Sequence, residues 1–141
     1  RMRVETRLEF RPTHFTQSAG LVCWYDTRHH YYLRVTHEDG IGSILGIVFT
    51  DQGRYDELER GRLVVEGWPV VHLCADIDGA HVRFGASCDG TRWTEVGPAL
   101  DLSKLSDDYA CGFTGAMVGL CAQDLGGFGS HADFGSFSFS P

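Results

Sequence analysis

Residues 71–87, VHLCADIDGAHVRFGAS, decide the fold class, because apolar and polar side chains alternate on both sides of a turn signal. The apolar positions are Val71, Leu73, Ala75 and Ile77 before the turn and Val82, Phe84 and Ala86 after it. A period of two places such side chains on one face of a strand. Asp78-Gly79, between the two runs, suits a two-residue hairpin turn. The stretch therefore predicts two antiparallel strands that share one buried face.

Runs of the same kind extend outward from this hairpin in both directions. They are Val4–Arg11, Gly20–Tyr25, Tyr31–Thr36, Ile44–Thr50 and Trp93–Val96. Asp39-Gly40 and Asp89-Gly90 are further turn signals, and residues 101–109 have room for only one helical turn. About ten short strands with turns every eight to twelve residues are typical of a two-sheet antiparallel β-sandwich. The length of 141 residues fits a single all-β domain over residues 1–141.

The last run carries three phenylalanines at uneven spacing. Phe137 and Phe139 are two residues apart and share a face, whereas Phe134 is three residues before Phe137. The odd spacing would place Phe134 on the opposite face, unless Gly135 forms a β-bulge that resets the register.

Composition argues against several classes of protein. Hydrophobic residues make up 43% of the chain, and no apolar run approaches the roughly 20 residues of a membrane helix. Twelve basic against nineteen acidic residues give a net charge of −7, whereas a nucleic-acid binder needs a basic face. We therefore expect neither a membrane nor a nucleic-acid partner. The five cysteines form no C-x-x-C pair, which favours reduced structural thiols over a zinc site.

No motif predicts a catalytic or metal centre. Asp76-Ile77-Asp78-Gly79 begins like a calcium loop but lacks the later acidic ligands, and the hairpin explains it. His29 and His30 would point to opposite faces of a strand, so they cannot easily coordinate the same metal ion. A glycosidase needs two carboxylates on opposite sides of the sugar bond, and no pair in the sequence stands out for this role. Aromatic side chains that could stack on sugar rings remain, although we expect most of them in the core: Trp24, Tyr25, Tyr31, Tyr32, Trp68, Trp93 and Phe113.

Several stretches together resemble one known family. Gly112–Gly119, GFTGAMVG, is similar to the family's GFTGAFVG. Other matching stretches are Leu21–Tyr25 followed by Tyr31–His37, Gly97–Asp101, Leu105–Asp107, Cys121–Leu125 and His131–Phe134. The family is the C-terminal concanavalin A-like domain of the β-xylosidases in glycoside hydrolase family 43, and the resemblance runs from near residue 8 to residue 139.

The resemblance implies a sandwich appended to an N-terminal five-bladed propeller that carries the catalytic acids. The sandwich itself would hold no catalytic residue. It would send a loop toward the mouth of the active site, where Phe113 would contact a xylo-oligosaccharide substrate. Oligomers are compatible with this arrangement.

Two departures from the family pattern matter. Met117 stands where the family has a second Phe, and Gly135 stands where it has an Asp. Relatives also carry strands before the point where this chain starts, and a structural calcium would use acids from both ends of the domain. Asp133 is the one candidate calcium ligand here, and no cofactor is required. Because the chain begins with Arg1 rather than Met, we interpret it as a fragment or processed product, and the resemblance implies the C-terminal part of a larger enzyme.

The leading hypothesis is thus a non-catalytic accessory domain of a β-xylosidase or α-arabinofuranosidase that acts in xylan breakdown. A first alternative is a free-standing carbohydrate-binding module that uses exposed aromatic side chains. A second is a small stand-alone hydrolase.

Overall fold

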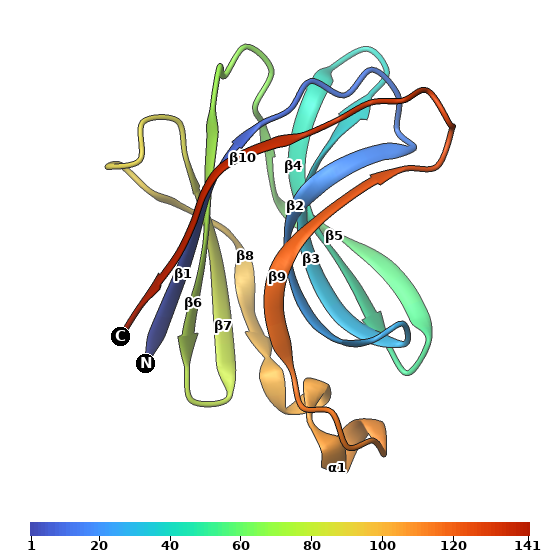
Figure 1. The fold of residues 1–141 in the computed structure, drawn as a ribbon, viewed down its shortest axis with the longest axis vertical. Helices are drawn as coiled ribbons and strands as arrows, with labels where there is room; N and C mark the ends of the chain where they lie inside the picture. The colour runs from blue at the N-terminus through green and yellow to red at the C-terminus, as the bar shows by residue number, and fades with distance from the viewer.

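The computed structural model describes all 141 residues as two five-stranded antiparallel sheets packed face to face (Figure 1). The strands are β1 (Met2–Glu9), β2 (Gln17–Asp26), β3 (His29–Glu38), β4 (Gly42–Asp51), β5 (Arg54–Val64), β6 (Val71–Asp78), β7 (His81–Ser87), β8 (Thr94–Asp101), β9 (Met117–Asp124) and β10 (Asp133–Ser140). Sheet A has the order β10-β1-β6-β7-β8, and sheet B has the order β5-β4-β3-β2-β9. The expected two-sheet sandwich is confirmed.

The only helical residues lie between β8 and β9. They form a 3₁₀ turn, Leu102–Leu105, and the single turn of α1 (Asp107–Ala110), as the sequence predicted. Asp101 and Ser106 cap these turns with their side-chain oxygens. Neither helix is long and apolar enough to cross a membrane.

The core lies between the sheets and consists of side chains at alternate strand positions. Leu21, Leu33 and Leu45 on sheet B are completely buried, and so are Leu8 and Leu73 on sheet A. Twenty buried residues form this one cluster. Burying a side chain of this size stabilises the fold by about 1.5–3 kcal/mol, so the alternation read from the sequence supplies the main driving force.

The β6–β7 hairpin turns one residue later than the sequence predicted. Asp78 pairs with His81, so the two loop residues are Gly79 and Ala80. Gly79 has φ +60°, whereas Ala80 has no positive φ. A positive φ at the first loop position alone is the pattern of a type II′ turn, which favours glycine there. The expectation that Asp78 and Gly79 form the turn is therefore wrong by one position.

A bulge at Gly135 resolves the uneven spacing of the phenylalanines in β10. Along the β1–β10 pair, Arg7 faces Ser136 but Leu8 faces Phe134, which leaves Gly135 unpaired. Phe134 and Phe137 consequently both lie opposite inward-facing residues of β1. The bulge that the sequence suggested is confirmed.

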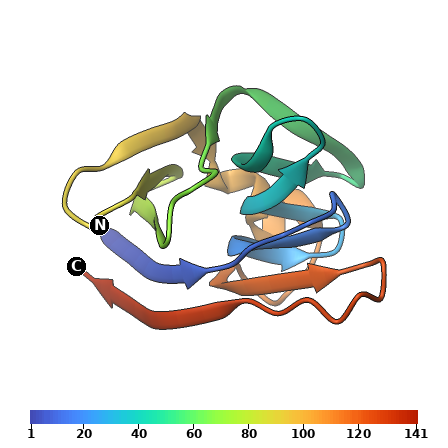
Figure 2. The ribbon, with the colours of Figure 1, turned by 90° about the horizontal axis from the view of Figure 1, so that it is seen from above.

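The sandwich is closed along one side and open along the other. On the closed side β5 meets β8, where a Cβ on Gly61 would lie 2.2 Å from the backbone nitrogen of Gly97. Both glycines have positive φ, so no other residue suits either position. On the open side, β9 and β10 are the free edges of their sheets. The two termini lie beside each other there, where Arg3 pairs with Ser140 (Figure 2).

Burial predicts very different effects for two phenylalanines of sheet A. Phe84 is 1% exposed, and Phe84→Ala should lower the free energy of unfolding by about 3–5 kcal/mol. Phe139 is 71% exposed, and Phe139→Ala should change it by less than about 1 kcal/mol. Urea denaturation of the two variants measures both values. Equal losses would contradict the packing described here.

Candidate functional site

Phe113, the residue predicted to contact substrate, lies on the loop of residues 111–116 between α1 and β9. Its side chain is 98% exposed, more than any other large hydrophobic side chain in the chain. The residue pattern placed Phe113 among aromatic side chains expected mostly in the core, whereas the family resemblance implied that it is displayed. The structure displays it.

The loop that carries Phe113 is held by one carboxylate. The Tyr25 hydroxyl donates a 2.7 Å hydrogen bond to Oδ1 of Asp107, and the Gly115 amide donates a 3.1 Å hydrogen bond to the same oxygen. These two donors keep the pKa of Asp107 below its ordinary value. Burial, followed by the bond to Asp107, raises the pKa of Tyr25. The carboxylate is thus ionised and the phenol protonated at neutral pH, which is the state that this bond needs.

The backbone just before Phe113 fits closely against the same tyrosine. Cys111 adopts the left-handed conformation, with φ 60° and ψ 41°, and ends α1. At Gly112 a Cβ would lie 2.1 Å from the Tyr25 hydroxyl oxygen. Only glycine allows the chain to pass the tyrosine this closely, so the loop has a defined path although Phe113 itself contacts solvent.

The base of the loop rests on a buried aromatic cluster. His29 contacts the Tyr25 and Tyr109 rings edge-on, at 6.2 and 6.0 Å between centroids, and its Nδ1 lies 2.8 Å from Oδ1 of Asp26. The Tyr109 hydroxyl donates to Asp51 at 2.7 Å. His29 therefore has a packing role, and its neighbour His30 lies on the opposite face of β3, as expected. No group of three or more His, Cys, Asp or Glu side chains is arranged to hold a metal ion.

An apolar cleft of about 370 Å³ opens between the sheets on their open side. All the residues that line it are apolar: Met2, Val4, Cys23, Ile77, Leu102, Ala116, Met117, Val118, Phe137 and Phe139. Ala116 and Met117 continue directly from the Phe113 loop, so the loop and the cleft form one surface. Met117 is 60% exposed here, at the position where the family pattern has a phenylalanine.

Asp133, the candidate calcium ligand, lies at the start of β10, opposite Glu9 of β1. Its side chain is 70% exposed, and Nε2 of His131 lies 3.9 Å from its Oδ2. Calcium takes six to eight oxygen ligands, whereas no group of three or more His, Cys, Asp or Glu side chains is arranged to hold a metal ion here. The residues of this chain therefore do not by themselves fit a calcium ion at this position.

The other candidate aromatic residues separate into core and surface. Tyr25 and Tyr31 are buried in the main core, and Trp68 packs against its edge. Trp93 lies on the outer face of sheet A, with the Arg3 guanidinium 4.7 Å from its ring centroid. Trp24 and Tyr32 instead line a groove on the outer face of sheet B.

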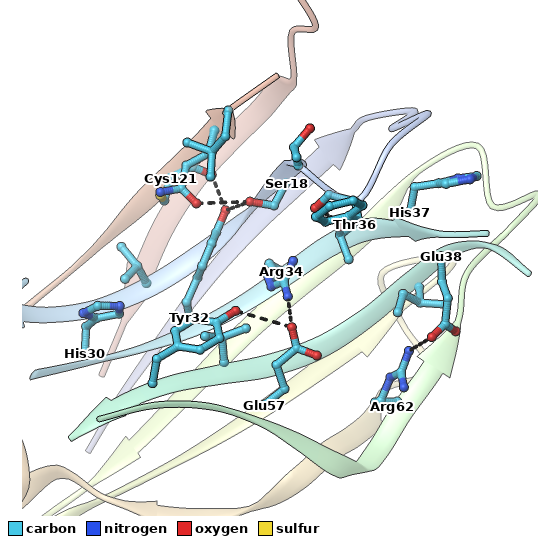
Figure 3. A pocket seen from close by; sticks show the side chains of 18 of the residues that line it. Ser18, His30, Tyr32, Arg34, Thr36, His37, Glu38, Glu57, Arg62 and Cys121 are labelled. Atoms are coloured by element: carbon cyan, nitrogen blue, oxygen red, sulfur yellow. Dashed lines mark hydrogen bonds and ion pairs between the residues drawn. The ribbon is translucent and has the colours of Figure 1, made fainter. Parts of the chain in front are cut away.

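The groove on sheet B has a volume of about 750 Å³ and is lined by polar, aromatic and aliphatic side chains (Figure 3). The sequence analysis missed it as a unit. The signal was available, because every second residue of β3 carries a polar or aromatic group on the outer face: His30, Tyr32, Arg34 and Thr36. Two of the groove's three carboxylates are engaged by arginines, Glu57 by Arg34 and Glu38 by Arg62, and the third, Asp39, lies at the exposed rim. Neither Glu57 nor Glu38 is free to act as an acid or base beside the other.

Comparison with known proteins places the chain in a family. Residues 1–140 match the family model described as the β-xylosidase C-terminal concanavalin A-like domain. A protein of Escherichia coli (strain K12) is 40% identical over 144 residues, which cover 99% of this chain and 27% of that protein. A β-xylosidase of Bacillus subtilis (strain 168) is 35% identical over 139 residues, which cover 96% of this chain and 26% of that enzyme.

A solved structure agrees with these matches. The crystal structure of a xylan β-1,4-xylosidase from Bacillus halodurans C-125 superposes with a TM-score of 0.94 at 38% identity, over 99% of this chain and 27% of that enzyme. The chain thus spans about a quarter of the length of the relatives that it matches. The 141 residues belong to the C-terminal concanavalin A-like domain family of the glycoside hydrolase family 43 β-xylosidases.

Proposed function

We propose that this domain is a non-catalytic accessory domain of a family 43 β-xylosidase or α-arabinofuranosidase that acts in xylan breakdown. It packs on the N-terminal five-bladed propeller and helps to close the active-site pocket around the substrate. The observation that carries the proposal is Phe113, a fully displayed aromatic side chain on a loop with a fixed path.

The exposure of Phe113 has no structural explanation within the chain. At 98% exposure its ring gains almost nothing from burial, so it does not stabilise this domain. The hydrogen bonds of Asp107 nevertheless hold the loop in place around it. A rigidly presented aromatic ring is suited to contact a ligand or a partner, because little conformational entropy is lost on binding.

The apolar cleft indicates where the propeller would pack on this domain. Contiguous exposed apolar surface marks interaction sites in soluble proteins, and this surface runs from the cleft into the Phe113 loop. The free edges of β9 and β10 border it. Because the relatives are about four times as long as this chain, the remainder of such an enzyme is available to cover the cleft.

Replacing Phe113 separates its role at the active site from any role in folding. In the full-length enzyme, Phe113→Ala should lower kcat/KM for an aryl xyloside by about 1–3 kcal/mol, the scale of one lost apolar contact in a pocket. In the 141-residue chain, the same change should alter the free energy of unfolding by less than about 0.5 kcal/mol. Steady-state kinetics and urea denaturation measure the two values. Phe128→Ala, at an exposed phenylalanine outside the cleft, is the matched control. Unchanged kinetics for Phe113→Ala would contradict the proposal.

The accessory role also predicts that the 141-residue chain alone hydrolyses neither an aryl xyloside nor an aryl arabinofuranoside. A glycosidase needs two carboxyl groups facing one glycosidic bond, and no such pair is present in the groove. The assay compares repurified chain with a buffer blank and with the full-length enzyme as a positive control. Turnover that follows the chain through repurification would instead support a small stand-alone hydrolase.

Asp107 should act as a positioning residue for Phe113. In the full-length enzyme, Asp107→Ala removes both loop hydrogen bonds and should lower kcat/KM roughly tenfold, about 1.4 kcal/mol. Asp107→Asn retains the acceptor oxygen and should recover most of the activity. In the Phe113→Ala background, Asp107→Ala should cause little further loss, because both changes act through one side chain. Additive losses in this double-mutant cycle would show that Asp107 acts by another route.

A further inference from the structure

The outer face of sheet B is hollowed into the groove that Figure 3 shows, and its lining comes from all five strands of the sheet. Five strands spaced about 4.8 Å apart span roughly 19 Å, so the groove is long enough for an extended ligand. Its volume of about 750 Å³ lies within the range of small-molecule sites. Neither the Phe113 loop nor the apolar cleft contributes to its lining.

Both arginines of the groove are paired with carboxylates. Arg34 pairs with Glu57, and Nη2 of Arg62 lies 3.1 Å from Oε1 of Glu38. At the upper rim, Nε2 of His37 lies 3.3 Å from Oδ1 of Asp39. An anionic ligand would find no unpaired arginine in the groove and would face its carboxylates instead. The lining therefore favours a neutral, polar ligand over an anionic one.

Flat aromatic side chains lie in one row across an end of the groove, because Trp24 pairs with His30, His30 with Thr50, and Thr50 with Tyr55. On β2 and β3, the Trp24 and His30 rings stack at 4.9 Å with an interplanar angle of 23°. Burial is the first cause of a lowered pKa for His30, so the imidazole is neutral at neutral pH. On β5, Tyr55 is 62% exposed. These rings offer apolar faces to the C–H faces of a sugar ring.

Polar groups of the groove retain unused hydrogen-bonding capacity. The guanidinium of Arg34 has five N–H donors, and one of them is taken by Glu57. Gln123 accepts from Ser18 with Oε1 at 3.4 Å, which leaves its NH₂ group free. The Tyr32 hydroxyl forms hydrogen bonds with the Ser18 hydroxyl and the Cys121 carbonyl, which fix the orientation of its ring. Fixed planar donors beside a row of aromatic faces match the hydroxyl rim and apolar faces of a neutral oligosaccharide.

We propose that this groove is a carbohydrate-binding site, separate from the Phe113 loop, for a linear neutral oligosaccharide of the xylan type. The assignment of xylan as the sugar rests on the proposed function, whereas the neutrality and length of the ligand follow from the lining. The Trp24 end of the groove adjoins the start of β9, since Trp24 pairs with Met117. A bound chain thus runs toward the end of the domain that displays Phe113.

Isothermal titration of the 141-residue chain with xylohexaose tests this site, with cellohexaose and an oligogalacturonate as comparison probes. We expect saturable binding of xylohexaose at one site per chain and no binding of the anionic oligogalacturonate. Tyr55→Ala and Trp24→Ala should each lower the association constant at least tenfold. Trp93→Ala is the matched aromatic control on the outer face of sheet A and should leave it unchanged.

The Tyr55→Ala variant distinguishes a loss of binding from a loss of folding. Trp24 packs on the small cluster of Val22, Tyr32 and Val48, so its removal can loosen the sheet, whereas Tyr55 is largely exposed. The site is overturned if xylohexaose does not bind up to about 10 mM, a limit near −2.7 kcal/mol. It is also overturned if neither variant weakens binding. A third contrary result is that Tyr55→Ala alters self-association, measured by sedimentation, and leaves the affinity for xylohexaose unchanged, because a second copy of the chain would then occupy the groove. The titration measures binding and no turnover, so its result does not test the accessory role. That role is tested separately by the kinetics of Phe113→Ala.

Discussion

Neighbouring side chains on a β-strand must lie on opposite faces of the sheet, and this constraint governs both surfaces of sheet B. In β3, Tyr31 and Leu33 face sheet A and are buried in the core, while Tyr32 and Arg34 face outward into the groove. The same strands therefore supply the hydrophobic contact that holds the sandwich together and the polar surface that a ligand can reach. A register shift of one residue would exchange the two sets and destroy both. The bulge at Gly135 is the one place in β10 where the chain corrects its own register.

Tyr25 connects the core to the loop that presents Phe113. Its ring belongs to the buried cluster, and its hydroxyl reaches the Asp107 carboxylate at the surface. The position of the loop is consequently tied to the most stable part of the domain. Loops without such a connection sample many conformations, and binding would then require them to be ordered. The fixed loop explains how a fully exposed aromatic ring can still have a defined direction.

The sequence was sufficient for the fold because the fold depends on local patterns. Alternation identified the strands, and the spacing of Phe134 and Phe137 revealed the bulge. The turn at Gly79 was misplaced by one residue, since an Asp-Gly pair fits either register until the partner strand is known. Phe113 was found through a resemblance, and its exposure needed the structure. The groove was missed because it joins residues from five strands, and the partners Arg34 and Glu57 are 23 residues apart. Side-chain pairs of that kind depend on strand order, which no local pattern specifies.

The arrangement of the three surfaces follows from which side of the sandwich is closed. Backbone contact between Gly61 and Gly97 leaves no space for a partner between β5 and β8. Apolar side chains that lack a covering layer therefore gather at the β9 and β10 edges, where Phe137 and Phe139 remain partly exposed. The Phe113 loop leads directly into β9, and Trp24 lies across from the first residue of that strand. A partner that covers the cleft would thus bring its own surface next to Phe113 and next to one end of the groove. Under the proposed accessory role, the domain would contribute to substrate handling because its strand order places a displayed ring, an apolar face and a polar groove at one edge.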